Sequence, residues 1–194
     1  MSKAAILLAI QQSKPAEVES PTRFKSQTTV QDDLRGAFSG MVNQIGGQVL
    51  SVESLEEIKD YVHQHFGSDE RVVTTIESLE QAFESIDPAV EPHELADVSL
   101  AILPGHFGVA ENAAIWLSDD QLGARVLPFI CQHLVVVLPE EQLVANLHEA
   151  YDRIGNSAYP FGVFIAGPSK TADIEQSLVV GAHGARSLLV FLLK

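Results

Sequence analysis

The chain has 194 residues and a formal net charge of −14, from 12 lysines and arginines against 26 aspartates and glutamates. This length suits one domain, and the negative charge argues against nucleic acid and anionic membranes as partners, although a local basic pocket for a small anion is compatible with it. The one cysteine, Cys131, cannot form an internal disulfide or hold an iron–sulfur cluster by itself, so we expect no cluster within one chain and a reducing, cytoplasmic location.

The first 24 residues are expected to form a helix and a polar arm. The apolar run Ala4–Ile10 is too short to span a bilayer and predicts an amphipathic helix. The segment "SKPAEVESPTRF" that follows carries two prolines, which indicates a linker or surface arm. We therefore assign residues 1–24 to this extension and residues 25–194 to a single α/β domain.

Strands and helices are expected to alternate along the first half of the domain. Apolar residues recur at helical spacing before Gly46 and Gly47, and Ser54 is a plausible N-cap for the next helix. In chain order the patterns predict a helix in 32–47, a strand in 48–52, a helix in 51–67, a strand in 71–76, a short helix in 77–86 and a loop in 87–94.

The second half continues in the same way. The segment 95–103 fits a strand or a helix equally well. Further elements are expected as follows: strands in 112–118, 132–139, 161–167 and 187–193, and helices in 140–155 and 171–184. Strands separated by helices predict an open, mostly parallel sheet with helices on both faces. Such sheets bind ligands at the carboxyl ends of their strands, where we expect the turn after residue 166 to lie.

That turn is the first candidate site. Gly167 permits a sharp turn, Ser169 and Thr171 are good helix caps, and Asp173 suits the positive end of a helix dipole. Lys170 does not suit it, unless an anion lies between the ammonium and the free backbone N–H groups. The alternative is an ordinary turn whose lysine points into water.

The segment "GPSKTADIEQSLVVGAHGARSLLVFLL", Gly167 to Leu193, resembles the C-terminal signature of the lactate utilisation protein C family, the LUD domain. The layout of the remaining chain agrees, so the resemblance covers essentially residues 1–194, weakly at the start and strongly at the end. It implies a fold like that of the sugar-phosphate isomerase, CoA transferase and formyltetrahydrofolate cyclo-ligase group. It also implies a role in a cytoplasmic system in which iron–sulfur partner proteins convert L-lactate to pyruvate, with this chain as the component without a cluster.

Two functions follow as hypotheses. The first is a non-cluster component of a lactate-utilisation system that binds a small anionic ligand or its iron–sulfur partners. The second is an independent enzyme of the transferase or cyclo-ligase type. The sequence leaves the oligomeric state open, a homo-oligomer included. The candidate ligand-binding residues are Gly167, Ser169, Lys170, Thr171, Asp173 and Glu175.

Glu111 is the candidate catalytic residue. It precedes an expected strand, where a carboxylate acts as a base, a nucleophile or a ligand contact, or is a solvated loop acid. Members of the family usually carry a Glu/Asp-Thr/Ser-Gly-Thr stretch, whereas this chain has Glu111 followed by Asn112, Ala113 and Ala114. We expect Glu111 and Lys170 to share a pocket. This requires the strand that follows Glu111 to run antiparallel to the strand in 161–167, or the segment before it to fold back over the carboxyl edge of the sheet.

Other polar residues are expected to have structural roles. The histidines lack the spacing of metal ligands, so we expect no metal site. His106 lies in a Pro-Gly loop, which fits a surface residue or a functional one. Arg186 precedes the last expected strand, which predicts a place at the opposite edge of the sheet from Lys170 and a role in an ion pair or a partner contact.

Overall fold

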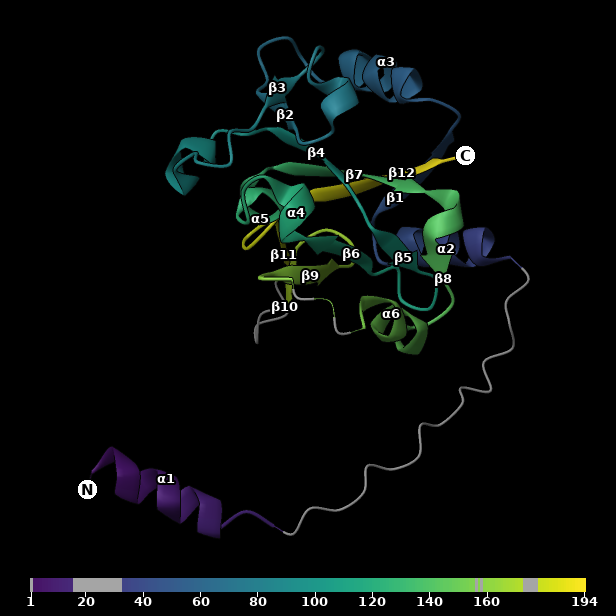
Figure 1. Ribbon diagram of the computed structural model, residues 1–194. Coiled ribbons are helices and arrows are strands. Elements are labelled where there is room, and N and C mark those ends of the chain that lie inside the picture. Colours follow the sequence, from purple (N-terminus) through teal and green to yellow (C-terminus); the bar gives the residue numbers. More distant parts are fainter. Residues whose placement is uncertain (1, 16–32, 156, 158, 173–177) are drawn as a thin grey trace.

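The computed structural model describes residues 2–15, 33–155, 157, 159–172 and 178–194. The body of the chain has four layers, which are α3 (Leu55–His65), a six-stranded sheet, a smaller four-stranded sheet and α6 (Leu147–Ile154) (Figure 1). The expected α/β class with a parallel sheet is therefore confirmed. Helix α3 covers one face of this sheet, and the other face packs mainly on the smaller sheet, with three further helices beside it.

The six-stranded sheet has the order β1-β12-β7-β4-β2-β3, and all its strand pairs are parallel. Its strands are β1 (Gln48–Val52), β2 (Val72–Thr74), β3 (Glu84–Ser85), β4 (Leu100–Pro104), β7 (His133–Pro139) and β12 (Ser187–Leu193). The strands β4, β7 and β12 are continuous apolar runs and almost wholly buried, as expected for strands covered on both faces.

Helix α3 covers the first face of this sheet. Ser54 is its N-cap, and the Ser54 hydroxyl accepts a hydrogen bond from the backbone N–H of Glu57. Ile58 and Val62 recur at helical spacing and pack on the sheet beside Phe191. The amphipathic pattern of the sequence therefore places this helix correctly.

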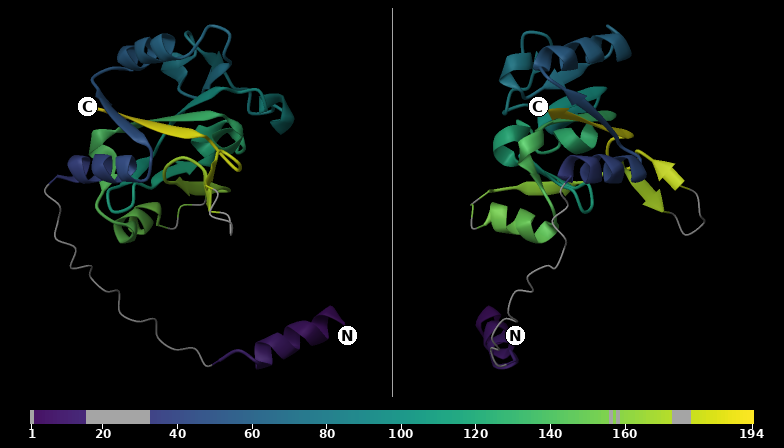
Figure 2. Two further views of the ribbon diagram at one scale, coloured as in Figure 1. Left: turned by 180° about the vertical axis from the view of Figure 1, so that it is seen from behind. Right: turned by 90° about the vertical axis from the view of Figure 1, so that its right-hand side faces the viewer.

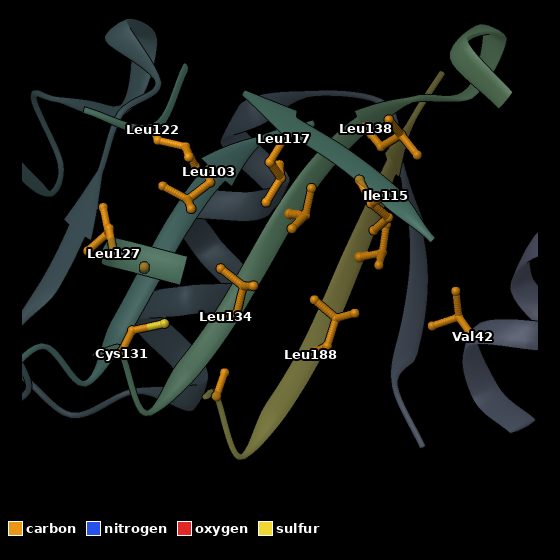
Figure 3. Close-up of a cluster of buried hydrophobic side chains, with 14 of the residues drawn as sticks. Val42, Leu103, Ile115, Leu117, Leu122, Leu127, Cys131, Leu134, Leu138 and Leu188 are labelled. Carbon is orange, nitrogen blue, oxygen red and sulfur yellow. The ribbon is translucent and has the colours of Figure 1, made fainter. Parts of the chain in front are cut away.

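The second face packs on the smaller sheet, whose order is β8-β5-β6-β9. Figure 3 shows Leu103, Leu134 and Leu188 of the large sheet meeting Ile115 and Leu117 of β6. The strands are β5 (Phe107–Val109), β6 (Ile115–Ser118), β8 (Leu143–Val144) and β9 (Gly162–Ile165), and three helices pack beside them: α2 (Leu34–Gln44), α4 (Asp119–Leu122) and α5 (Leu127–Ile130). The expected strands in 112–118 and 161–167 are thus present, but they belong to this second sheet.

Helix α6 lies on the outer side of the smaller sheet, where Ala150 is buried against Phe107 and Trp116. The predicted helix in 140–155 is wrong in its first half. That half forms a 3₁₀ turn, η3 (Glu140–Gln142), and the strand β8, because Leu143 and Val144 pair with β5. Asn146 then caps α6 by accepting a hydrogen bond from the N–H of Glu149.

The predicted helix in 171–184 is also wrong. The structure has an antiparallel hairpin of β10 (Lys170–Ala172) and β11 (Leu178–Val180), which projects from the body (Figure 2). Residues 173–177 lie outside the described residues. The β-branched residues at 171, 179 and 180 favour strand over helix, and Gly181, with φ of +81°, turns the chain after β11.

The remaining predicted elements are partly confirmed and partly wrong. The ambiguous segment 95–103 forms the end of η2 (Pro92–Leu95) and most of β4, and the helix in 77–86 is instead η1 (Glu77–Leu79) followed by β3. The N-terminal helix is present as α1 (Lys3–Gln12), with every residue exposed, whereas the arm at 16–32 lies outside the described residues. No described helix is long and apolar enough to cross a membrane.

Candidate functional site

The turn from Gly167 to Lys170 lies at the amino edge of the six-stranded sheet, the edge where its strands begin. The ammonium of Lys170 binds the carbonyl of Ile45, three residues before β1, and the N–H of Ser169 donates to the carbonyl of Ala185 at 2.8 Å, two residues before β12. The expected carboxyl-edge location is wrong because β9, the strand before the turn, belongs to the smaller sheet.

Glycines allow the two chain segments to approach closely here. Gly167 has φ of +74°, and a Cβ on it would lie 3.1 Å from the side chain of Ile45. Gly46 has φ of +92°, and a Cβ there would lie 2.9 Å from the ammonium of Lys170. The Gly-Gly pair expected to stop α2 thus also leaves room for the lysine.

Lys170 neutralises part of a helix dipole instead of opposing it. Ile45 is the C-cap of α2, so the ammonium lies at the negative end of that helix and satisfies one of its free carbonyl groups. The predicted conflict with a helix N-terminus is wrong, because no helix begins at residue 170. Among the described residues, the carbonyl of Ile45 is the acceptor of this ammonium, which has three hydrogens to donate.

A cavity of about 360 Å³ adjoins the turn. Its walls are mainly apolar, and its polar side chains come from Ser169, Lys170 and His183. Gly167 also lines it, so three of the predicted binding residues border one space. Asp173 and Glu175 lie outside the described residues, as does the side chain of Thr171.

A second cavity of about 510 Å³ lies on the other side of the turn formed by His183 and Gly184. Both cavities are bordered by this turn and by Phe129. Burial raises the pKa of the Cys131 thiol, which lines the second cavity, to about 12, so this group is neutral at physiological pH. No aspartate or glutamate is among the described residues that line either cavity.

Arg186 lines the second cavity and lies at the same edge of the sheet as Lys170. It follows Ala185, whose carbonyl binds the N–H of Ser169, and its own N–H donates to the carbonyl of Gln132 at 2.8 Å. The predicted separation of Arg186 and Lys170 on opposite edges is therefore wrong, because β9, the strand before Lys170, belongs to the smaller sheet.

Glu111 lies in the turn between β5 and β6. This turn is at the same end of the smaller sheet as Gly167, because β6 and β9 are antiparallel with Ile115 opposite Ile165. The carboxylate, however, accepts a hydrogen bond of 3.0 Å from the N–H of Leu147 at the start of α6, where a negative charge is favourable. Glu111 lines neither of the two cavities.

The residues after Glu111 keep a backbone shape that favours glycine. Ala113 has φ of +59° and is fully buried, and it stands where the resembled family carries glycine. The side chain of Asn112 closes the turn by accepting a hydrogen bond from the N–H of Ala114 at 3.0 Å. The turn therefore holds a buried alanine in the left-handed conformation, at a cost in strain.

A polar cluster that the sequence did not predict lies at the carboxyl ends of β4 and β6. His106 Nε2 is linked to Ser118 Oγ and, at 3.3 Å, to Asp120, and Ser118 Oγ donates to Asp120. Burial would raise the pKa of Asp120, but the hydrogen bond from Ser118 and the nearby His106 lower it. The hydroxyl of Ser118 is buried and shared by both partners, so this cluster is satisfied internally and offers no open nucleophile.

Metal binding has no support in the part of the chain that the structure describes, which holds no group of three or more His, Cys, Asp or Glu side chains placed to bind an ion. The only signal for the His106 cluster in the sequence is a histidine just after a buried strand and a Pro-Gly pair.

Comparison with protein-family models matches residues 92–193 to the LUD domain. Curated relatives include Lactate utilization protein C of Shouchella clausii, 33% identical over 101 residues, which are 50% of this chain and 43% of that protein. The protein of the same name from Geobacillus thermodenitrificans is 27% identical over 167 residues, covering 80% of this chain and 67% of the relative.

The matches to the first relatives leave much of those proteins uncovered. Lactate utilization protein C of Oceanobacillus iheyensis is 31% identical over 97 residues, which are 47% of this chain and 41% of the relative. Among solved structures, a DUF162 family protein from Deinococcus radiodurans superposes with a TM-score of 0.65, covering 84% of this chain and 97% of that one at 17% identity. That likeness supports the fold alone.

Proposed function

Since the chain belongs to the LUD domain family, we propose that it is a component of a lactate-utilisation system and that it binds a small anion at the amino edge of its large sheet. The observation that carries this proposal is the family match over residues 92–193, which contains the turn Gly167–Lys170 and both cavity-lining loops. The curated relatives are named for lactate utilization.

The anion site consists of the turn that brings Gly167, Ser169 and Lys170 to one cavity. The roles of Thr171, Asp173 and Glu175 stay predictions from the sequence. Lactate and pyruvate are small carboxylates at neutral pH. A surface with Lys170 and His183 and no carboxylate among its described lining residues attracts such anions, although the chain as a whole carries a charge of −14.

Redox chemistry in this system is assigned to iron–sulfur partner proteins in the cytoplasm. Cys131, the single cysteine, is buried with a raised pKa, and a cluster requires several thiolates. This chain then acts beside its partners as the component without a cluster.

The second candidate is an independent enzyme of the transferase or cyclo-ligase type that acts on a carboxylate or phosphate substrate, a class that the family resemblance implies only through its fold. It would pair Glu111 with Lys170. The engagement of the Glu111 carboxylate by the N-terminus of α6 argues against this pairing, so we favour the first function.

The test is genetic. Deleting the gene in its native organism should abolish growth on L-lactate as the carbon source and leave growth on pyruvate intact. The wild-type gene should restore growth, and a Lys170→Ala gene should restore it poorly. Normal growth of the deletion strain on L-lactate, with no second copy of the gene present, contradicts the proposal.

A further inference from the structure

Arg186 differs from the other arginines that the structure describes. Arg35, Arg71, Arg125 and Arg153 each donate hydrogen bonds to a side chain of the protein. The guanidinium of Arg186 has no side-chain or backbone partner within the described parts of the chain. Arg186 is exposed, and no described acidic side chain neutralises its charge in a protein with 26 acidic and 12 basic residues, so this charge is available to an anionic ligand.

The position of this side chain is nevertheless well defined at its base. Its backbone N–H is bound to the carbonyl of Gln132. Its aliphatic stem lies against the bare backbone of Gly181, where an added Cβ would overlap the Cγ of Arg186. Gly181 also has φ of +81°, which other residues rarely adopt, so glycine both shapes the turn and seats the arginine.

The surroundings of the guanidinium define the chemistry of a ligand. The cavity of about 510 Å³ has apolar walls from Val126, Phe129 and Ile130, and the thiol of Cys131 adds no charge. His183 is the other basic group that lines it. This arrangement suits a small molecule with one negative group and a short apolar part.

We propose that Arg186 binds the carboxylate of a small organic acid in this cavity, as a subsite separate from the Lys170 ammonium across the His183–Gly184 turn. The planar guanidinium matches a carboxylate with two parallel hydrogen bonds, which the ammonium of a lysine cannot reproduce. The choice of a carboxylate over a phosphate rests on the proposed function.

Isothermal titration of the full chain with pyruvate, L-lactate, acetate and inorganic phosphate tests this subsite. Wild-type protein should bind pyruvate or L-lactate more tightly than phosphate. Arg186→Ala should weaken that binding about 10- to 100-fold, the range expected for lost hydrogen bonds to a charged group. Arg186→Lys should also lose most of the binding, because lysine keeps the positive charge but cannot donate the two parallel hydrogen bonds of a guanidinium.

Two controls separate the possible outcomes. Arg125→Ala, which removes an arginine that pairs with Asp119 outside both cavities, should leave carboxylate binding unchanged. Thermal unfolding of each variant reports whether it is folded, and Arg186→Lys decides the question if Arg186→Ala is unstable.

The failures are distinguishable. Binding that survives in Arg186→Lys and Arg186→Ala but is lost in Lys170→Ala overturns this subsite and leaves the proposed function standing. Phosphate binding tighter than that of both acids overturns the carboxylate assignment. An absence of carboxylate binding to the wild-type chain removes both the subsite and the anion site of the proposed function.

Discussion

The two edges of the six-stranded sheet differ in the polar groups and cavities that the described residues place there. At the carboxyl edge, Thr74 bonds to backbone groups of neighbouring segments, and His106, Ser118 and Asp120 bond to one another. At the amino edge, two cavities open beside basic side chains, and Arg186 has no partner among the described residues.

This difference between the two edges indicates where the sheet offers a binding surface. Ligands usually bind at the carboxyl ends of parallel strands. Here the connections that leave β4 and β7 at that edge build the smaller sheet, and the carbonyl of Gln121 in α4 accepts a hydrogen bond from Thr75, directly after β2. The chain thus covers its own carboxyl edge, and the concave surface lies at the amino edge instead.

The largest expected effect concerns the closed edge. Thr74→Val keeps the shape of a fully buried side chain but removes the hydroxyl that donates to Ile102 and accepts from Ile76. We expect a loss of about 1–3 kcal/mol in the free energy of unfolding, because the N–H of Ile76 loses this partner and the carbonyl of Ile102 keeps, among the described residues, only the N–H of Thr75. Urea denaturation measures it.

The matched change at the open edge is Ser169→Ala. Within the described residues, the Ser169 hydroxyl accepts a single long hydrogen bond, of 3.4 Å, from the N–H of His183. The cost of Ser169→Ala should be smaller than that of Thr74→Val. Equal costs for the two variants would break the distinction between a closed and an open edge.

The turn of Glu111 should behave as part of the closed region, where the fold holds a strained backbone in place. Ala113→Gly relieves the left-handed conformation of a buried alanine, whereas Ala114→Gly relieves nothing at a neighbour that is equally buried. Ala113→Gly should therefore be more stable than Ala114→Gly by about 1–2 kcal/mol, the cost of the left-handed region for alanine. Equal stabilities in thermal unfolding would mean that residue 113 is not strained.

Two arginines that each directly precede a strand of the large sheet sharpen the comparison. Arg71 precedes β2 and donates to Glu84, Asp97 and the carbonyl of Glu94, whereas Arg186 precedes β12 without a side-chain partner in the described chain. Arg71→Ala should cost about 1 kcal/mol at neutral pH, since the ion pairs are partly exposed, and Arg186→Ala less than half of that.

The stabilisation by Arg71 should also depend on pH. Its hydrogen bonds lower the pKa of the Glu84 carboxyl and that of Asp97 in the folded state. A carboxyl whose pKa is lower in the folded than in the unfolded state stabilises the protein at any pH above its unfolded-state pKa of about 4. This stabilisation is lost as the pH falls from about 4 through the lowered folded-state pKa. The difference in stability between wild type and Arg71→Ala should thus be constant from pH 7 to about pH 5 and shrink below pH 4. A constant difference down to pH 2 would show that the charges do not matter.

The smallest expected effect concerns Lys170. The ammonium stabilises the C-terminus of α2, so Lys170→Ala should lower the free energy of unfolding by about 0.3–1 kcal/mol. The sequence predicts the opposite sign, because it places the lysine at the start of a helix. A more stable variant in chemical denaturation would favour that earlier prediction and contradict the contact with Ile45.

Local patterns in the sequence were sufficient for the elements that bury one face. The capped helix after Ser54 and the apolar strands in 132–139 and 187–193 are confirmed. The second sheet was not predictable in this way, because its strand pairs join residues distant in the sequence, such as Phe107 with Trp116 and Trp116 with Phe164.

For the candidate site, too, local patterns in the sequence identified residues but not their position in the fold. The residues of the Gly167–Lys170 turn were identified from their chemistry and from the family signature, and three of them border one cavity. The location at the amino edge and the role of Arg186 depend on which sheet receives β9, and no local pattern in 161–167 distinguishes the two sheets.

The most direct test of an open amino edge is an NMR titration of the isotope-labelled chain with pyruvate, followed through its backbone amide signals. We expect concentration-dependent shifts at Gly167, Ser169, Gly181 and Arg186, and unchanged signals at Ser118 and Asp120. Shifts confined to the carboxyl edge, at His106 and its neighbours, would contradict the account.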